Sequence, residues 1–231
     1  MEEVVIVGAA RTPIGSLGGS LSSLSAPRLG ALAVKAAVQR AGIDPGLIQE
    51  LFMGNVLAAG QGQAPATQVA VFAGLPLIPA TLINKVCASG MKAVMLGAQS
   101  IMNGENTVVA AGGMESMSNV PYYLEKARGG YRLGHQQVAD GIIKDGLWDV
   151  YNDYHMGSAA ELCAGACGIS REEQDAYAVT SYRRALNAQE NGLFQEEIAP
   201  VEIETRAGNV LISEDEEPRA VKFERIPALR P

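Results

Sequence analysis

Cys87 occupies the point where a predicted strand passes directly into a predicted helix, within Asn84-Lys-Val-Cys-Ala-Ser-Gly-Met-Lys-Ala93. A cysteine at a helix N-terminus lies at the positive end of the helix dipole, which favours its thiolate form. The N–H groups of the same turn could receive an oxyanion when that thiolate attacks a carbonyl. Ala88, Ser89 and Gly90 are small and leave room for an acyl group beside the sulfur. On position alone, a nucleophile and a buried structural cysteine are equally good interpretations.

Two other cysteines, Cys163 and Cys167, lie four residues apart and would share one helix face. Together with His155 they could suggest a metal site, but a fourth ligand and a usual ligand spacing are lacking. Buried small residues are therefore the favoured interpretation of this pair. His155 is also a candidate base for Cys87, because His135 is the only other histidine in the chain.

The overall composition limits the classes of partner. The net charge of −7 argues against a general nucleic-acid binder, which needs a basic face. Three cysteines are too few for a disulfide framework, which favours a reducing compartment. No apolar run approaches the ~20 residues of a membrane span, and the acidic N-terminus resembles neither a signal peptide nor a transit peptide. We therefore expect no membrane partner, and a cytoplasmic location, or the mitochondrial matrix if a transit peptide has been removed.

The segments around Cys87 alternate between strand and helix. Apolar runs predict four strands, the first of them buried on both faces: Val4–Val7, Leu51–Val56, Thr81–Val86 and Thr107–Ala111. The helical spacing of apolar residues predicts three helices between them: Arg28–Arg40, Ala64–Ala73 and Ser89–Met102. This alternation favours an α/β sheet with right-handed crossovers.

The helix that follows Cys87 is apolar on nearly every side. From Ala88 to Met102 its only charged residue is Lys92. Such a helix should be buried on nearly all sides, which a single sheet cannot achieve. A second layer above the helix is implied, and the chain offers no obvious second sheet to supply one.

The pattern changes after Ser116. Residues 117–154 are rich in Gly, Tyr and charge, and they predict an irregular excursion. Two helices follow, His155–Cys167 and a second that begins with the capping box Ser170-Arg-Glu-Glu173. The remaining features are a short hairpin, an acidic run and a basic tail: Val201–Thr205 with Val210–Ile212, Glu214–Glu217, and residues 219–230.

The segment Asn84–Ala93 resembles the nucleophile segment of the thiolase family, and within it the acetyl-CoA acetyltransferases, especially the mitochondrial acetoacetyl-CoA type. Further segments resemble thiolases, in thiolase order, along essentially the whole chain: Val7–Gly15, Met53–Val56, Gly60–Thr67, Gly112–Asn119, Lys144–Leu147, His155–Ser158 and Glu173–Tyr177. Seven ordered matches leave little room for coincidence. The resemblance therefore favours the nucleophile interpretation of Cys87.

The resemblance implies an α/β, thiolase-like fold, namely the N-terminal strand-helix half-domain of a layered αβαβα sandwich plus a loop domain. Residues 1–116 would form the half-domain with the nucleophile. Residues 117–231 would form the coenzyme A-binding loop domain, with its return into the core cut short. Complete thiolases continue into a second half, whose Asn-Glu-Ala-Phe, Gly-His-Pro and Cys-x-Gly segments include the activating histidine and an acid-base cysteine. Neither Asn-Glu-Ala-Phe nor Gly-His-Pro occurs in the sequence, so we expect the C-terminal half to be absent from this chain.

Several positions match thiolase segments that bind coenzyme A. Leu147, His155 and Met156 match the lining of the pantetheine channel, which places His155 on the coenzyme A path rather than beside Cys87 as its base. A basic stretch matches the part that holds the nucleotide end: Arg219, Lys222 and Arg225. Tyr182 matches a tyrosine that lies near both coenzyme A and a potassium ion in the mitochondrial type. The alternatives are an ordinary loop histidine, a solvated basic run and one face of an amphipathic helix.

The reaction implied by the resemblance is ping-pong acyl transfer through an acetyl-Cys87 intermediate. Two acetyl-CoA molecules give acetoacetyl-CoA and coenzyme A, or the reverse, in lipid and ketone body metabolism. Coenzyme A is then a substrate, potassium a candidate ion, and no other cofactor is expected. The complete enzyme would be a homodimer or homotetramer, and this chain alone inactive. A truncated, non-catalytic coenzyme A-binding or structural fragment and a longer-chain 3-ketoacyl-CoA thiolase are the alternatives.

Overall fold

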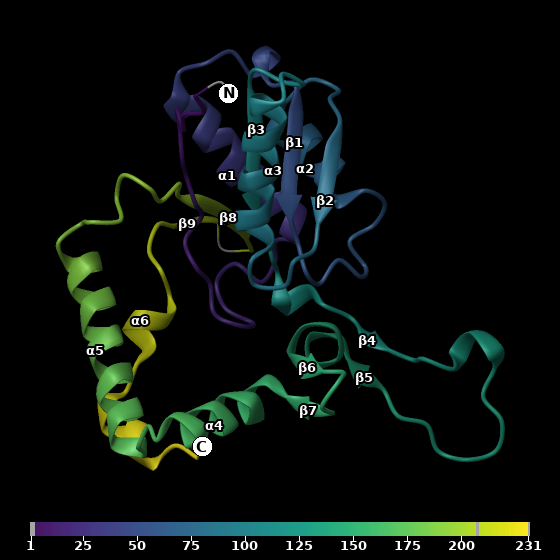
Figure 1. The fold of residues 1–231 in the computed structure, drawn as a ribbon, viewed down its shortest axis with the longest axis vertical. Helices are drawn as coiled ribbons and strands as arrows, with labels where there is room; N and C mark the ends of the chain where they lie inside the picture. The colour runs from purple at the N-terminus through teal and green to yellow at the C-terminus, as the bar shows by residue number, and fades with distance from the viewer. Residues whose placement is uncertain (1–2, 207, 231) are drawn as a thin grey trace.

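The computed structural model describes residues 3–206 and 208–230. Its centre is a parallel sheet in the order β2-β1-β3, formed by Ala80–Ile83, Glu50–Gly54 and Val109–Gly113 (Figure 1). Leu51 of β1 lies opposite Ala80 of β2 and Ala110 of β3. A parallel sheet with helices between its strands confirms the predicted α/β class.

Helices cover both faces of this sheet. α1 (Ala26–Ala41) and α2 (Pro65–Ala73) pack on each other and on the face that carries Leu51 and Met53, and the short helix η1 (Pro45–Leu47) leads into β1. α3 (Ser89–Met102) lies on the opposite face, on the near side of the sheet in Figure 1. The buried core is therefore on the α1 and α2 side, where Leu51 and Val69 are completely inaccessible.

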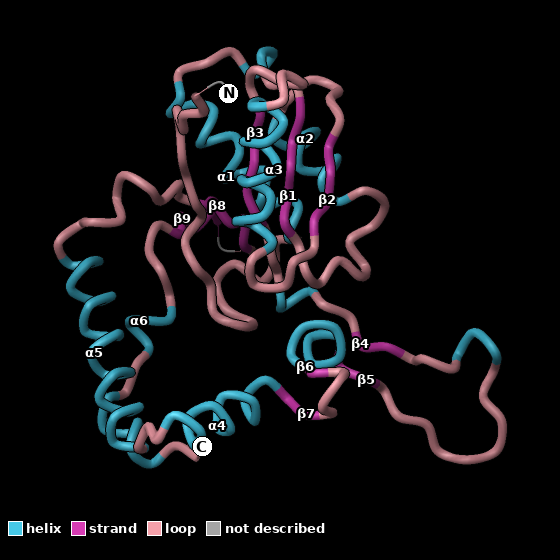
Figure 2. Tube along the Cα trace, in the orientation of Figure 1, coloured by secondary structure: helices cyan, strands magenta, loops and turns pink. Residues whose placement is uncertain are grey.

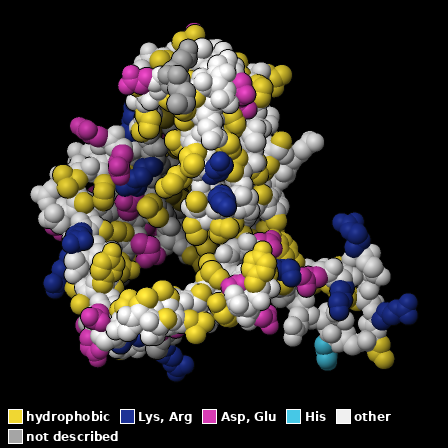
Figure 3. All heavy atoms as spheres, in the orientation of Figure 1, with side chains coloured by type: hydrophobic (Ala, Val, Ile, Leu, Met, Phe, Trp, Pro, Cys, Tyr) yellow, Lys and Arg dark blue, Asp and Glu magenta, His cyan; other side chains and the backbone are white. Residues whose placement is uncertain are grey.

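α3 is buried along one face only. Its buried positions follow a stripe of small residues that faces the sheet: Ser89, Ala93, Gly97 and Ser100. The apolar residues on its other side remain exposed, among them Met91 at 71% and Met95 at 49%. One sheet covers only one side of a helix, so the outer side of α3 is exposed in the described chain, in line with the absence of an obvious second layer in the sequence. Figure 3 shows apolar side chains gathered on this face.

The predicted strand Val4–Val7 is also wrong. The segment has no strand assignment, and Val5, Ile6 and Val7 are 61–79% exposed. It lies beside α1, since a Cβ added to Gly8 would stand 2.5 Å from the Ala37 carbonyl oxygen. In residues 3–206 and 208–230, the first pairing of this N-terminal segment is an isolated parallel bridge between Arg11 and Ile198.

The irregular excursion after β3 is confirmed. Its elements are short turns and two-residue strands: η2 (Met117–Asn119), β4 (Tyr122–Tyr123), η3 (Ala127–Gly129), β5 (Ala139–Asp140), η4 (Ile143–Leu147), β6 (Trp148–Asp149) and β7 (Tyr154–His155). Antiparallel pairs β4-β5 and β6-β7 hold its base. Figure 2 shows the part between β4 and β5 as a long loop that extends away from the sheet.

Two helices form an arm beyond the excursion (Figure 1). α4 (Met156–Cys167) is followed by α5 (Arg171–Glu190), which begins with the predicted capping box. The Glu173 amide donates to Ser170 Oγ at 3.2 Å, and the Ser170 amide donates to Glu173 Oε2 at 2.8 Å. Among the described residues, no helix combines the length and the apolar character that a membrane crossing requires.

The chain then returns to the sheet domain. The predicted hairpin forms as β8 (Val201–Thr205) and β9 (Gly208–Ile212), and Val201 and Ile203 pack with Leu21 and the outer side of α1. α6 (Glu217–Ala220) and η5 (Phe223–Ala228) follow, and η5 lies against α5. The division into domains at residue 116 stays a prediction.

The acidic run after the hairpin anchors the N-terminal loop. Arg11 donates from both terminal nitrogens to the Asp215 carboxylate at 2.7 and 2.9 Å, and the Ile14 amide donates to Asp215 Oδ1 at 2.8 Å. Burial raises the pKa of Asp215, but these hydrogen bonds outweigh it and the pKa is lower than the ordinary 3.8. The backbone amides of Ser16 and Ser20 lower the pKa of Glu216. The run thus joins segments about 200 residues apart in sequence.

Asp215→Asn should lower the free energy of unfolding by about 2 kcal/mol, because it weakens a buried, charge-assisted contact with Arg11. A carboxylate with a depressed folded-state pKa stabilises the fold above its unfolded pKa and loses this effect as the pH falls through the folded value. The difference between wild type and variant should therefore be constant above about pH 5 and shrink below about pH 4.

Chemical denaturation across pH measures this difference. Glu214→Gln is the matched control, since Glu214 forms only an exposed ion pair with Arg219 and should cost well under 1 kcal/mol. Equal stability of wild type and Asp215→Asn at pH 7 would contradict the anchoring role.

Candidate active site

Cys87 lies between the end of β2 and the start of α3. The predicted strand Thr81–Val86 ends earlier, at Ile83, so residues 84–88 form a connecting elbow. The carboxyl ends of the parallel strands and the N-terminus of α3 meet at this edge, the lower edge of the sheet in Figure 1. The Cys87 thiol is exposed rather than buried. This placement gives a ligand access to a sulfur beside a helix N-terminus.

The elbow is held in an unusual backbone conformation. Val86 has φ +49°, which is a strained value for a β-branched residue. Its amide donates to Asn84 Oδ1 at 3.0 Å, and its carbonyl accepts from Ser89 Oγ at 2.5 Å. Ser89 Oγ in turn accepts from the Lys85 amide at 2.8 Å. A strained backbone conformation persists only where the surrounding contacts hold it in place, and such conformations are common at functional sites.

The first turn of α3 lies directly against the strand ends. A Cβ added to Gly54 of β1 would stand 2.5 Å from the Gly90 nitrogen, and one added to Gly113 of β3 would stand 3.2 Å from the Gly90 Cα. No real side chain tolerates the first distance, so glycine is required at position 54. The backbone contact fixes where α3 begins and hence where Cys87 lies.

Cys163 and Cys167 lie on α4 and are both exposed, so their interpretation as buried small residues is wrong. Within the described parts of the chain, no three His, Cys, Asp or Glu side chains gather as a metal site would require.

The structure brings together the three positions predicted to line the pantetheine channel. β7 pairs with β6 so that His155 lies opposite Trp148, next to Leu147, and Met156 begins α4. His155 is half-buried and Met156 is exposed. His155 Nδ1 accepts a hydrogen bond from the Gly157 amide at 2.9 Å, so the neutral ring carries its proton on Nε2. Because the Nδ1 lone pair is already used as the N-cap of α4, His155 is poorly suited to act as a base.

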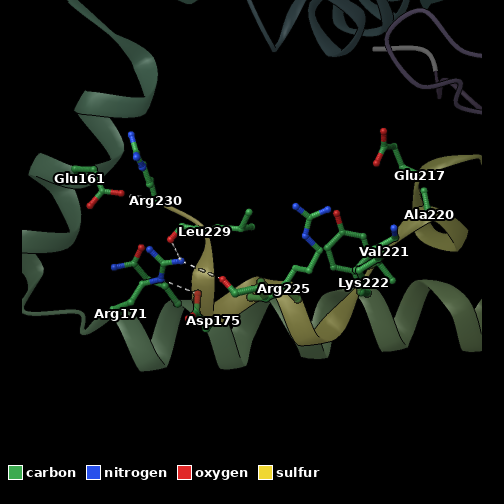
Figure 4. Close-up of a pocket in the computed structure, with 14 residues that line it drawn as sticks. Glu161, Arg171, Asp175, Glu217, Ala220, Val221, Lys222, Arg225, Leu229 and Arg230 are labelled. Carbon is green, nitrogen blue, oxygen red and sulfur yellow. Dashed lines mark hydrogen bonds and ion pairs between the residues drawn. The ribbon is translucent and has the colours of Figure 1, made fainter.

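A second site lies on the arm, between α5 and the C-terminal segment. An open groove of about 710 Å³ is lined by Tyr182 of α5. Lys222 and Arg225 line it from the C-terminal segment (Figure 4). Sequence reasoning missed two further cations in its lining, Arg171 and Arg230. Arg171 pairs with Asp175 at 2.8 Å and donates to the Leu229 carbonyl at 2.9 Å, so it fastens the tail to α5.

Arg219 does not line this groove. It forms an ion pair with Glu214 at 2.7 Å, and both side chains are exposed. By contrast, Lys222, Arg225 and Arg230 form no ion pair within residues 3–206 and 208–230. The groove also contains carboxylates, of which Asp175 is paired and Glu217 accepts from Ser16 Oγ at 2.8 Å. The unpaired cations leave the groove able to attract an anionic ligand such as a phosphate.

Tyr182 is half-buried and packs edge-on against Phe223, with ring centroids 6.4 Å apart. Its phenolic oxygen is one potential oxygen ligand, and one oxygen does not hold a potassium ion. The potassium site stays a prediction.

Comparison with known proteins assigns the chain to a family. A family model described as the N-terminal domain of thiolase matches residues 4–231. The chain belongs to the thiolase family.

Curated relatives match along the whole chain. Acetyl-CoA acetyltransferase 1 of Arabidopsis thaliana is 56% identical, with 99% of this chain and 56% of the relative covered. The mitochondrial acetyl-CoA acetyltransferase B of Xenopus laevis is 55% identical, with 100% of this chain and 55% of the relative covered. This thiolase chain therefore spans slightly more than half the length of the relatives it matches.

Solved thiolases share its fold. Acat5 thiolase from Ascaris suum, solved in complex with coenzyme A, superposes with a TM-score of 0.91 at 40% identity, covering 98% of this chain and 57% of that one. Acetyl-CoA acetyltransferase from Syntrophomonas wolfei superposes with a TM-score of 0.90 at 41% identity, covering 98% of this chain and 57% of that one. The predicted thiolase-like fold is confirmed over this stretch.

Iodoacetamide should alkylate Cys87 faster than Cys163 and Cys167 in the folded chain at neutral pH, because only Cys87 lies at a helix N-terminus. Mass mapping after brief treatment gives the order of labelling. The same treatment in denaturant is the control, since the three thiols should then react at similar rates. Earlier labelling of either α4 cysteine in the folded chain would refute the assignment.

Proposed function

We propose that this chain carries the nucleophile and the coenzyme A-binding part of an acetyl-CoA acetyltransferase. The observation that carries the proposal is an exposed cysteine at the start of α3 in a chain of the thiolase family. The cation-lined groove on the arm supports the same substrate class, because coenzyme A ends in a phosphate-bearing nucleotide. The relatives named acetyl-CoA acetyltransferases support an acetyl group over a longer acyl chain.

In the proposed first step, the Cys87 thiolate attacks the carbonyl carbon of acetyl-CoA. A new bond forms between the Cys87 sulfur and the acetyl carbon, the bond to the coenzyme A sulfur breaks, and coenzyme A leaves as its thiolate. The positive end of α3 and the N–H groups of its first turn would stabilise the oxyanion formed on the way.

In the second step, a second acetyl-CoA loses a methyl proton to a base and its carbanion attacks the acetyl group on Cys87. A carbon–carbon bond forms, the bond to the Cys87 sulfur breaks, and acetoacetyl-CoA is released with the thiolate restored. Thiolysis is the same sequence in reverse. The base for these proton transfers would come from outside this chain, since His155 already uses Nδ1 as a helix cap.

The proposed path of coenzyme A joins the two sites. Lys222 and Arg225 would bind its phosphates in the groove, with Tyr182 beside the nucleotide, while Leu147, His155 and Met156 would line the pantetheine arm toward Cys87. Arg219 would contribute less, because Glu214 already neutralises it outside the groove.

A C-terminal half like that of complete thiolases would cover the exposed apolar face of α3 and supply the acid-base groups. The complete enzyme would be a homodimer or homotetramer in lipid and ketone body metabolism, in the cytoplasm or the mitochondrial matrix. A non-catalytic, coenzyme A-binding fragment is the second candidate, favoured by the unsuitability of His155 as a base.

Lys222→Glu and Arg225→Glu together should weaken coenzyme A binding at least about tenfold, because each removes a charge-assisted contact to phosphate. Pantetheine, which lacks the nucleotide, should bind nearly as before. Titration calorimetry with both ligands measures the two affinities. Arg184→Glu, an exposed change on α5 outside the groove, is the matched control, and equal losses for both ligands would contradict the phosphate contacts.

The chain ending at Pro231 should not cleave acetoacetyl-CoA above background, because attack and enolate formation each need an acid-base group and His155 already uses Nδ1 as a helix cap. Adding the C-terminal part of the Arabidopsis relative as a separate polypeptide should restore turnover and reduce self-association, since it would cover α3. Loss of acetoacetyl-CoA, with Cys87→Ser as the blank, is the measurement. Sustained turnover by the purified chain alone would show that a base exists within it.

A further inference from the structure

The geometry points to Glu115 as a positioning residue for the Cys87 elbow, acting through the Val56 backbone and Asn84. The inference rests on the proposed role of Cys87 as the nucleophile. Glu115 follows β3, about thirty residues from Cys87 in sequence, and no pattern around it predicted a role in that site.

The Glu115 carboxylate clamps the end of β1 to the end of β3. It accepts hydrogen bonds from Asn55 Nδ2 at 2.7 Å, from the Val56 amide at 2.9 Å and from the Leu57 amide at 3.3 Å. Asn55 is 1% exposed and also donates to the Met114 carbonyl at 3.2 Å. Within the described residues Glu115 forms no ion pair, so its carboxylate is bound by these N–H groups alone.

The clamp continues into the elbow through one side chain. The Val56 carbonyl accepts a long hydrogen bond from Asn84 Nδ2 at 3.4 Å, and Asn84 Oδ1 accepts from the Val86 amide at 3.0 Å. Asn84 therefore bridges the clamped loop after β1 and the residue before Cys87.

The bridge acts on the backbone conformation of Val86. A β-branched residue at φ +49° returns to negative φ when its constraints weaken, which would rotate the following peptide and move Cys87 away from the start of α3. Ser89 constrains the Val86 carbonyl from the helix side, and Asn84 constrains its amide from the strand side. Glu115 fixes the loop after β1, whose Val56 carbonyl binds the Asn84 side chain.

Glu115→Gln tests the relay because an amide cannot accept from all three N–H groups, and its NH₂ would face a donor. Alkylation of Cys87 by iodoacetamide in the folded chain should slow by about tenfold, as expected for loss of a charge-assisted hydrogen bond. The rates of Cys163 and Cys167 should not change, and Glu105→Gln, at an exposed glutamate, should leave all three rates unchanged.

Rescue separates positioning from simple loss of stability. Asparagine tolerates positive φ far better than valine, so Val86→Asn in the Glu115→Gln background should restore most of the Cys87 rate. An unchanged rate in Glu115→Gln would overturn the inference. A loss that Val86→Asn does not restore, together with faster hydrogen exchange throughout the sheet domain, would also overturn it by showing a role in the fold alone.

A second pair of variants tests the relay if Glu115→Gln does not fold. Asn84→Asp keeps the acceptor for the Val86 amide but loses the donor to the Val56 carbonyl, whereas Asn84→Ala removes both contacts. Cys87 should react more slowly than wild type in both variants, and more slowly in the alanine variant than in the aspartate variant. A wild-type rate of Cys87 alkylation in Asn84→Asp would overturn the inference. If Cys87 is not the fastest thiol in wild type, the proposed function fails instead, so the two failures are distinguishable.

Discussion

The contact on which the site depends is the approach of the first turn of α3 to the ends of β1 and β3. Gly54 and Gly113 allow backbone to lie against backbone there, at distances that a side chain at Gly54 would prevent. Farther along α3, Ala93 and Gly97 continue the close packing on the sheet. The helix therefore starts at one fixed place, and the elbow before it has to turn sharply. The strained backbone at Val86 and the exposed thiol after it follow from that turn.

The same packing leaves the described chain with one covered and one uncovered side of α3. Small residues face the sheet, whereas the large apolar residues Met91, Val94 and Met95 face away from it and remain exposed. The exposed N-terminal segment, with Val5 to Val7, adds to the apolar surface. Apolar surface of this kind marks an interface or a tendency to associate. It is consistent with a chain that spans about 56% of the length of its relatives.

Polar contacts, together with a small apolar contact of Phe223 and Ile226 of η5 with α5, hold the arm in place of a second large core. α4 and α5 contain no buried residues. Instead, Arg171 fastens the tail to α5, and Asp215 and Glu216 fasten the segment before it to the N-terminal loop. This arrangement keeps Lys222 and Arg225 on an open groove without burying their charge. An accessible, cationic groove suits a large anionic ligand better than a closed apolar pocket would.

The sequence by itself determined the elements that depend on local signals. The α/β alternation, the capping box at Ser170, the β8-β9 hairpin and the position of Cys87 before a helix could all be predicted, because each signal lies within a few neighbouring residues. The motifs also predicted the family, which the comparisons confirm.

Tertiary structure decided whatever depends on partners distant in sequence. Val4–Val7 has the pattern of a buried strand, yet it is exposed, because burial requires neighbours that a strand cannot provide for itself. In the basic tail, Arg219 forms an ion pair with Glu214, whereas Arg230 lines the groove together with Arg171. How the tail lies on α5 determines this difference. The link from Glu115 to the elbow depends on the strand order β2-β1-β3. Glu115 follows β3 and contacts the end of the neighbouring strand β1, and the elbow that contains Cys87 follows β2 on the other side of β1. Periodicity reports which side of an element is apolar, but only the packed fold determines what meets that side.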